Sequence, residues 1–425
     1  MKILAPLRLR AFRILWTGMT ISLVGDGITL VAIAWQVYEL SNLPTALGTT
    51  MMAMSIPQVL LLLFGGFASD RFDRRWMMLA ADLVRAAALV ALGALSITGV
   101  LEIWHMMVIA VVYGAGSAFF GPAFDALVPE IVPEHLLAQA NSVDQLVRPL
   151  AARLAGPAIG GWIIATVGVG SAFLIDAATF GVSMVCLLCL GRVHASASSR
   201  ADTAPLSPLR DMREGFAFVF SHVWLWGTFV AATFAYLLFL GPSEVLLPYI
   251  VKNELGGSAG DLGLVFATGG LGAIAASVYM AQRGMPVRNM TFIYVAWSLS
   301  TLAVAGYGLA RLPWQAMAAC FVFNAFETAG LIVWLTIKQS LVPARLLGRV
   351  SSLDWLISIG LMPVSYALAG PVASVLGTRE TLVGAGLLGA AVTLGFLLLP
   401  NMRAPERTMR VALADRLATP SSAHQ

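Results

Sequence analysis

The decapeptide GFASDRFDRR occupies residues 66–75, between two long apolar runs at 45–68 and 76–98. A run of about 20 apolar residues is enough for a helix to cross the roughly 30 Å hydrocarbon layer of a membrane. The charged decapeptide therefore predicts a short connection at a membrane surface, joining two spanning helices. Its arginines, Arg71, Arg74 and Arg75, favour the cytoplasmic surface.

The composition of the whole chain indicates the same environment. Of its 425 residues, 59% are hydrophobic and only 11% are charged, and the mean hydropathy is +0.83. Soluble domains carry roughly 25% charged residues, so lipid must surround most of this chain. The apolar runs are continuous rather than alternating, which excludes a β-barrel and predicts an all-α integral membrane protein.

Twelve apolar segments follow one another along the chain. They lie at 14–38, 45–68, 76–98, 103–126, 141–167, 171–191, 222–250, 258–282, 290–310, 314–338, 350–376 and 380–399. Pro242, Pro248 and several glycines make 222–250 and 258–282 the least regular of them. We expect twelve transmembrane helices, the first being a permanent helix rather than a cleaved signal peptide.

The positive charges predict the orientation. With the N-terminus in the cytoplasm, twenty Lys and Arg residues fall in cytoplasmic segments, and only Lys252, Arg311 and Arg379 fall in outer loops. Both termini should then be cytoplasmic. The outer loops are too short for a receptor ectodomain. Arg outnumbers Lys by 23 to 3, which favours a GC-rich bacterial source. We expect a multi-pass protein of a bacterial inner membrane.

The chain divides into two similar halves. The segment VPEHLLAQANSVDQL at 132–146 recurs 210 residues later as VPARLLGRVSSLDWL, with seven of fifteen positions identical. A Ser-, Pro- and charge-rich stretch separates the halves, as a linker would. We predict a six-helix bundle at 1–191, a cytoplasmic linker at 192–215, a second six-helix bundle at 216–400 and a cytoplasmic tail at 401–425. Parallel repeats of this kind favour a substrate site near the midplane, between the halves.

The loop at 66–75 resembles the G-x-x-x-D-R-x-x-R-R loop of the major facilitator superfamily, with Asp73 where that motif usually has Gly. The resemblance covers essentially the whole chain and implies a transporter of two pseudo-symmetric six-helix bundles. It also implies a cytoplasmic gate that locks the halves together. The residues expected to form this gate are Gly66, Asp70, Arg71, Arg74, Arg75, Asp144 and Asp354. The arginines would in any case anchor the loop at the lipid surface.

A second motif lies in the fifth segment, where Gly156, Pro157, Gly160 and Gly161 match the G-P-x-x-G-G signature of drug–proton antiporters. The alternative is ordinary close packing, because glycines and prolines are common in membrane helices. Short stretches of the first and sixth segments, VGDGI at 24–28 and FLIDA at 173–177, resemble the branch of macrolide and tetracycline efflux proteins and the enterobactin exporter.

Charged residues inside the apolar segments are functional candidates, because a central charge costs roughly 2.5–3.5 kcal/mol on insertion scales. The flanking charges put Asp26 and Glu327 near the midplane and Arg153 halfway along its segment. Asp176 and Glu244 lie nearer the outer surface, as further candidates for proton coupling.

Asp26 and Glu327 are the preferred proton-coupling candidates, one from each half. Burial disfavours the charged carboxylate, so such a group can load and release a proton as access alternates. The alternative is a permanent structural pair, for example Asp26 with Arg153. Arg153 is equally a candidate for docking an anionic substrate. Asp82 and Arg85, three residues apart, are expected to pair with each other.

Several classes of function are poorly supported. There is no Walker-type phosphate loop, no nucleophile elbow and no aromatic-interleaved basic patch, so we expect no enzyme, no ATP drive and no nucleic acid partner. The three cysteines, Cys186, Cys189 and Cys320, and the five histidines form no metal-ligand pattern. We expect no cofactor and no metal.

The resemblance and the midplane carboxylates together predict a monomeric, proton-coupled antiporter that exports small amphiphilic compounds by rocker-switch alternating access. Its partners would be a small-molecule substrate, protons and the lipid bilayer. Three alternatives remain: a dedicated siderophore or metabolite exporter, a lysophospholipid translocator without obligatory proton coupling, and a membrane sensor or scaffold. The scaffold would have no use for midplane carboxylates.

Overall fold

The computed structural model describes residues 2–190 and 208–407, and over these ranges the chain is helical with no strand. Its side chains are described except at 2–4, 63, 65–71 and at scattered positions of 134–146, 208–215 and 344–359. All twelve predicted segments fall on helices within the described ranges. Ten helices there are long and apolar enough to span a membrane, and a further pair passes only when joined.

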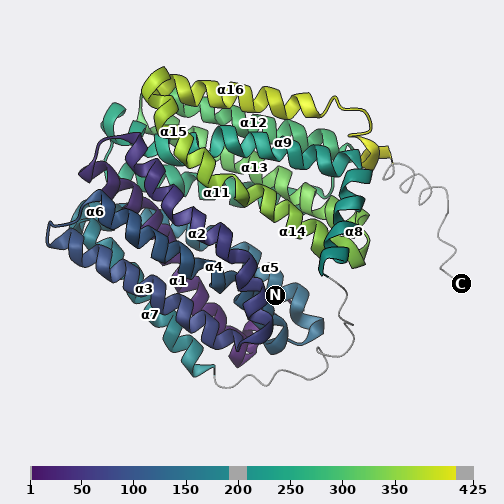
Figure 1. Cartoon of the computed structure of the whole chain (residues 1–425), viewed down its shortest axis with the longest axis horizontal. Coiled ribbons are helices and arrows are strands. Elements are labelled where there is room, and N and C mark those ends of the chain that lie inside the picture. Colours follow the sequence, from purple (N-terminus) through teal and green to yellow (C-terminus); the bar gives the residue numbers. More distant parts are fainter. Residues whose placement is uncertain (1, 191–207, 408–425) are drawn as a thin grey trace, which may run out of the picture.

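The N-terminal bundle is drawn in purple to teal in Figure 1. A short 3₁₀ helix, Lys2–Arg8, precedes it. Its helices are α1 (Arg10–Leu40), α2 (Pro44–Arg71), α3 (Arg74–Ile97), α4 (Ile103–Ile131), α5 (Glu134–Arg148), α6 (Gly156–Val167) and α7 (Val169–Cys189). A π-helical stretch, Pro149–Ala155, joins α5 to α6, because Pro149 cannot donate the backbone hydrogen bond of a regular helix. The fifth predicted segment is therefore one span built from two helices.

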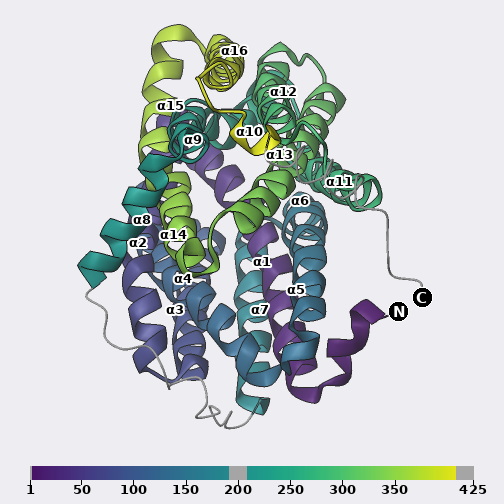
Figure 2. The same ribbon diagram turned by 90° about the vertical axis from the view of Figure 1, so that its right-hand side faces the viewer.

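The C-terminal bundle lies above it in Figures 1 and 2, in green to yellow. Its helices are α9 (Val223–Gly241), α10 (Leu247–Tyr249), α11 (Ala259–Arg283), α12 (Asn289–Leu309), α13 (Pro313–Leu341), α14 (Ala344–Gly360), α15 (Met362–Leu376) and α16 (Thr378–Phe396). Gly377, with φ of +97°, turns the chain between α15 and α16, which are bent by 119°. These two helices are the pair that passes the span test only when joined.

The two segments expected to be irregular behave differently. Pro242 and Pro248 break the first, so that π-helical stretches at Pro242–Leu246 and Ile250–Glu254 flank α10. The glycine-rich second segment is an uninterrupted helix, α11. Membrane helices tolerate glycine, because packing against a neighbouring helix compensates for its weak helix propensity.

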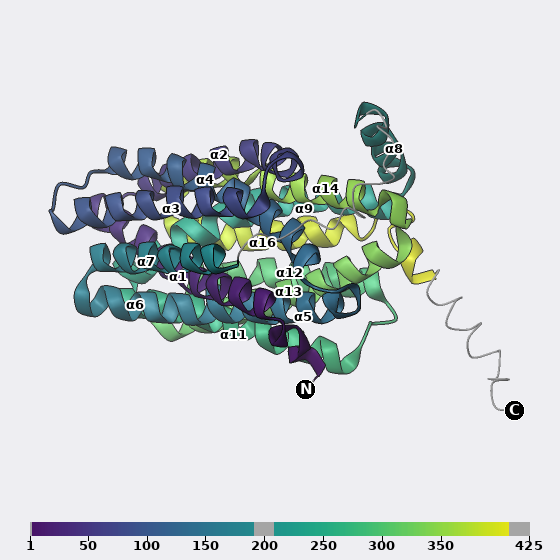
Figure 3. The same cartoon turned by 90° about the horizontal axis from the view of Figure 1, so that it is seen from below.

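The predicted linker at 192–215 is only partly described. Residues 192–207 lie outside the described range, and the remainder enters α8 (Pro208–Ser221). Figure 3 shows α8 standing at one end of the molecule, where it contacts α9 and α14. We call this end, at which α2 passes into α3 and the Arg74–Arg75 pair lies, the arginine-rich end. The other is the opposite end.

The packing of apolar side chains differs between the two ends. Near the opposite end a single buried cluster includes residues of both bundles, such as Val37 and Leu47 with Val245 and Ala369. Toward the arginine-rich end each bundle has a cluster of its own, around Phe12 in one and Trp334 in the other. Among the described side chains, the buried apolar cluster that the two bundles share therefore lies near the opposite end.

Polar contacts reinforce this seal between the bundles. The Tyr38 hydroxyl of α1 donates to the Val245 carbonyl oxygen at 2.6 Å. The Lys252 Nζ donates to the Tyr38 carbonyl oxygen at 2.5 Å and lies 5.1 Å from the ring centroid of Trp35. Close helix contacts complete it, since a Cβ on Gly161 of α6 would stand 2.7 Å from the Ala259 carbonyl oxygen of α11.

Candidate functional site

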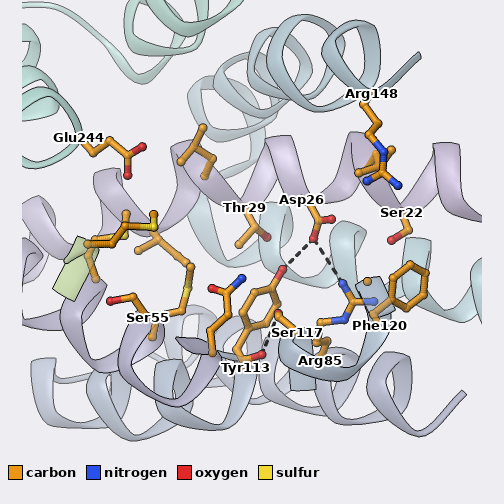
Figure 4. Close-up of a pocket in the computed structure, with 18 of the residues that line it drawn as sticks. Ser22, Asp26, Thr29, Ser55, Arg85, Tyr113, Ser117, Phe120, Arg148 and Glu244 are labelled. Atoms are coloured by element: carbon orange, nitrogen blue, oxygen red, sulfur yellow. Dashed lines mark hydrogen bonds and ion pairs between the residues drawn. The ribbon is translucent and has the colours of Figure 1, made fainter. Parts of the chain in front are cut away.

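A cavity of about 440 Å³ lies between the two bundles. Helices α1 to α4 supply most of its wall, and the C-terminal bundle contributes Glu244, Met362 and Tyr366. The wall is mainly apolar and rich in methionine, which adapts to ligands of different shape. Its charged side chains are Asp26, Arg85, Arg148 and Glu244 (Figure 4).

Asp26 faces this cavity from the middle of α1. Its side chain keeps 30% of its exposure, and its Oδ1 accepts a 2.8 Å hydrogen bond from the Tyr113 hydroxyl of α4. The same oxygen lies 4.0 Å from Nη1 of Arg85, which is 6% exposed. Figure 4 shows Tyr113 and Arg85 converging on this carboxylate. The cation beside Asp26 is therefore Arg85, not Arg153.

Arg85 also binds a second carboxylate. Its Nη2 donates to Asp82 of the same helix, as the sequence spacing predicted, and Asp82 accepts a further 2.7 Å bond from the Ser183 hydroxyl of α7. The guanidinium lies 4.6 Å and 4.3 Å from the ring centroids of Phe120 and Phe180. These contacts fix the guanidinium between α1, α3, α4 and α7.

Asp176 is a third carboxyl of the same region. Its side chain is fully buried, and it accepts hydrogen bonds from the hydroxyls of Thr29 at 2.5 Å and Thr179 at 2.8 Å. It packs against Gly25, the residue before Asp26, so the two carboxyls lie at the same depth. The sequence placed Asp26 and Asp176 at different depths, whereas the structure brings them side by side; the depth of the pair in the membrane stays a prediction.

The N-terminal bundle therefore buries three carboxyl groups around one guanidinium. Asp26 and Asp82 share Arg85, while Asp176 has only hydroxyl donors within hydrogen-bond distance among the described residues. Burying an uncompensated charge is costly, and carboxylates that share one site repel one another. The group of Asp26, Asp82 and Asp176 is hereafter called the carboxyl cluster. Asp26 is its member in contact with the cavity.

The C-terminal bundle carries a separate set of polar groups. Glu244 accepts a hydrogen bond from the Tyr366 hydroxyl and faces the cavity opposite Asp26 (Figure 4). Arg153 donates from Nη1 to the Asn324 Oδ1 of α13 at 3.2 Å, across the two bundles, and interacts electrostatically with Glu244 and Glu327. The carboxyl groups that interact with Arg153 are thus those of the other half, not Asp26.

The candidate gate residues with described side chains make contacts within their own bundles. Asp144 pairs with Arg148 at 2.6 Å within the N-terminal bundle, and Asp354 pairs with Lys338 at 2.6 Å within the C-terminal one. Arg74 contacts Glu130. Arg75 contacts the Leu187 carbonyl oxygen at 2.7 Å. The side chains of Gly66, Asp70 and Arg71 lie outside those described.

Asp73, the departure from the superfamily loop, is the N-cap of α3. Its side chain accepts from the backbone N–H groups of Arg75 at 2.9 Å and Trp76 at 3.3 Å. Its φ of −61° requires no glycine. The substitution therefore suits the turn, because an aspartate satisfies N–H groups that a glycine would leave to water.

The glycines of the GPAIGG motif present two faces of α6. A Cβ on Gly156 would stand 2.5 Å from the Val24 carbonyl oxygen, and one on Gly160 would stand 2.8 Å from the Ile28 Cα, both in α1. Gly161 instead faces α11 of the other bundle. The motif packs α6 within its own bundle and also forms part of the seam between bundles.

Comparison with known families decides the identity of the fold. The family model described as "Transmembrane secretion effector" matches residues 1–421. The chain belongs to this family of the major facilitator superfamily. The predicted superfamily and the all-α membrane fold of two six-helix bundles are therefore confirmed.

Two curated relatives of this major facilitator protein are named as efflux proteins. It is 28% identical to the multidrug efflux pump Tap of Mycolicibacterium fortuitum, over 94% of this chain and 96% of the relative. It is 23% identical to macrolide efflux protein A of Streptococcus pyogenes, over 89% and 93%. A solved bacterial homologue of the lysosomal transporter Spinster has the same fold, with a TM-score of 0.65 and 14% identity over 95% of this chain and 98% of that one.

The sequence identified Asp26 but not the partners that this major facilitator protein assembles around it. Tyr113 gave no signal in an apolar segment, and Arg85 was assigned only to Asp82. The available signal was the presence of both Asp82 and Arg85 deep in one apolar segment, since two such charges are rarely buried for packing alone.

Proposed function

We propose that this transporter exports small amphiphilic compounds in exchange for protons. The observation that carries the proposal is the carboxyl cluster beside a cavity lined by methionines: Asp26 and Asp82 share Arg85, and the neighbouring Asp176 is held by hydroxyl groups. Support for export comes from two relatives, a multidrug efflux pump and a macrolide efflux protein.

In this proposal Asp26 is the principal exchange site. A proton on Asp26 leaves its hydrogen bond with Tyr113 in place but weakens its attraction to Arg85. Loss of that proton strengthens the ion pair and gives a cationic or hydrogen-bonding substrate a carboxylate to bind. Asp176 is the second proton acceptor of the carboxyl cluster. Thr29 connects it to the cavity, because its side chain lines the cavity and its hydroxyl donates to Asp176.

Glu244 and Glu327 are the corresponding candidates in the C-terminal bundle, with Arg153 as their charge partner or as a docking point for anionic substrate groups. Alternating access would open the seam at the opposite end and close the arginine-rich end. Asp144 and Asp354, which pair within their own bundles, would then meet the other half across the interface. Each proton that enters through a potential of 100 mV supplies about 2.3 kcal/mol.

We further propose a monomer in a bacterial inner membrane, with the arginine-rich end and both termini in the cytoplasm. The positive charges support this orientation. The boundaries proposed for the two bundles, the linker and the tail remain those given by the sequence. With this orientation the cavity receives substrate from the cytoplasm.

Substrate-driven proton movement in proteoliposomes tests the proposal. Purified wild type, Asp26→Asn and Glu102→Gln are reconstituted with an internal pH dye and challenged with macrolides, tetracyclines, cationic dyes, siderophores and lysophospholipids. Glu102 is an exposed carboxylate before α4 and serves as the matched control. We expect at least one amphiphilic compound to move protons through wild type and Glu102→Gln, and not through Asp26→Asn.

Other outcomes separate the alternatives. Proton movement with a siderophore alone would replace drug export by dedicated metabolite export. Transport of labelled lysophospholipid or of another solute without proton movement would refute coupling.

A further inference from the structure

A second cavity, of about 310 Å³, lies inside the N-terminal bundle near the arginine-rich end. It is enclosed by the first turns of α1, the last turns of α4 and the inner face of α5. Its lining residues are Phe12, Trp16, Phe124, Asp125, Val128, Pro129, Leu137, Ala140 and Asp144. None of these lines the central cavity. Its volume is within the range of small-molecule sites, roughly 300–1,000 Å³.

Two polar atoms in the wall of this second cavity are buried without a partner. Trp16 Nε1 and Asp144 Oδ1 have no hydrogen-bond partner within the described part of the chain. The other oxygen of Asp144 is occupied by Arg148. Buried polar groups are rarely left unsatisfied, so this donor and this acceptor, carried by two residues that line one cavity, indicate a ligand that provides their partners.

The electrostatics of the wall specify the class of ligand. Asp125 and Asp144 contribute two carboxylates, and Arg148 is the cation that interacts with both. The aromatic rings of Phe12, Trp16 and Phe124 supply flat apolar surfaces. An excess of negative charge between aromatic faces suits an organic cation, which gains from the carboxylates and from cation–π attraction together.

Arg148 stands between the second cavity and the central one. It lines the central cavity, pairs with Asp144, and its guanidinium carbon lies 5.5 Å from the ring centroid of Phe124. Its Nη2 is 3.8 Å from the sulfur of Met19, another residue of the central cavity. A cation bound at Asp144 would displace the Arg148 guanidinium toward the central cavity. The charge of Arg148 therefore couples the two cavities.

We propose that the second cavity binds amphiphilic organic cations before they reach the central cavity. Only its role as an entry site rests on the proposed export function, because binding itself requires neither a gradient nor transport. Asp144, predicted from sequence as a gate residue, would then also be a ligand-binding residue.

Ethidium binding to the purified full chain in neutral detergent tests this inference. Ethidium has a fixed positive charge, and its fluorescence rises when it leaves water. We expect two classes of sites in wild type and in the Glu102→Gln control. The double variant Asp125→Asn/Asp144→Asn should raise the Kd of one class about tenfold and spare the other. Asp26→Asn should weaken only the class that the double variant spares.

A variant with the opposite effect excludes misfolding as the explanation. Arg148→Gln removes the cation that competes for Asp144, and should therefore lower the ethidium Kd of the second cavity. The inference is overturned if the double variant keeps both classes at wild-type affinity, or if Arg148→Gln fails to tighten binding. If ethidium binds as expected but neither ethidium nor any compound of the proteoliposome panel is transported, the site stands and the proposed export function fails.

Discussion

The seam between α6 and α11 offers the sharpest test of how the bundles close. Gly161 lies in it, and a Cβ there would stand 2.7 Å from the Ala259 carbonyl oxygen and 3.0 Å from the Gly263 Cα. Both are backbone atoms that no side-chain rotation can move. Ordinary contact begins at 3.4 Å, so Gly161→Ala must part the two helices by about 0.7 Å.

Overpacking of this kind typically costs about 1–3 kcal/mol. The cost falls only on the state in which α6 and α11 touch, so it shifts the population toward the state open at the opposite end by roughly 5- to 150-fold. Gly160→Ala is the matched control, since its Cβ would meet Ile28 of the same bundle at 2.8 Å. Gly181→Ala, with no atom within 4 Å of its Cβ, is the neutral control.

Distances between spin labels, measured by double electron–electron resonance, report the population of the state that is open at the opposite end. Labels at Val167 and Asn253, both exposed and in different bundles, report the opening of the opposite end in a chain with Cys186, Cys189 and Cys320 replaced by alanine. We expect a longer-distance population to rise in Gly161→Ala alone. Equal distributions in Gly161→Ala and Gly181→Ala would refute this reasoning, and so would equal opening by Gly160→Ala.

Three further predictions concern other contacts. Tyr38→Phe removes the hydrogen bond to Val245, worth about 1 kcal/mol, and should open the opposite end in the same distance measurement; an unchanged distribution would remove Tyr38 from the seal. Lys338→Met leaves Asp354 buried without its cation and should lower the free energy of unfolding in detergent by about 3–5 kcal/mol, largely restored by adding Asp354→Leu; equal losses in the single and double variants would contradict this. Asp73→Ala removes the cap of α3, worth about 1 kcal/mol, and should speed hydrogen exchange of the Arg75 and Trp76 amides several-fold, whereas Asp73→Ser should not; unchanged exchange in Asp73→Ala would refute the cap.

The helices and the candidate Asp26 could be predicted from sequence because their signals are local. A run of apolar residues reports its own length, and a carboxylate within it stands out against its neighbours. Breaks at Pro149 and Pro242 are local as well, although the sequence does not show that the chain stays helical through them as π-helix.

The partners of Asp26 could not be predicted, because they depend on how four helices cross. Arg85 follows Asp26 by 59 residues and Asp176 follows it by 150, and either could have faced lipid or another helix. The contact of Asp176 with α1 could not be predicted for the same reason, since it depends on how α7 packs against Gly25.

The gate at the arginine-rich end stays a prediction. Asp144 and Asp354 bind cations of their own bundles, so a contact of either carboxylate across the halves would need these ion pairs to break. In this prediction, the loop at 66–75 contributes to a gate that forms when the two bundles meet at the arginine-rich end.

Proton release on substrate binding tests the central claim most directly, namely that the carboxyl cluster holds an exchangeable proton. Purified protein in weakly buffered detergent is mixed with a transported compound while a pH indicator counts the protons released. We predict about one proton for each substrate bound in wild type and Glu102→Gln, and a clear loss in Asp26→Asn and Asp176→Asn. Undiminished release in both cluster variants, with substrate still bound, would contradict the account.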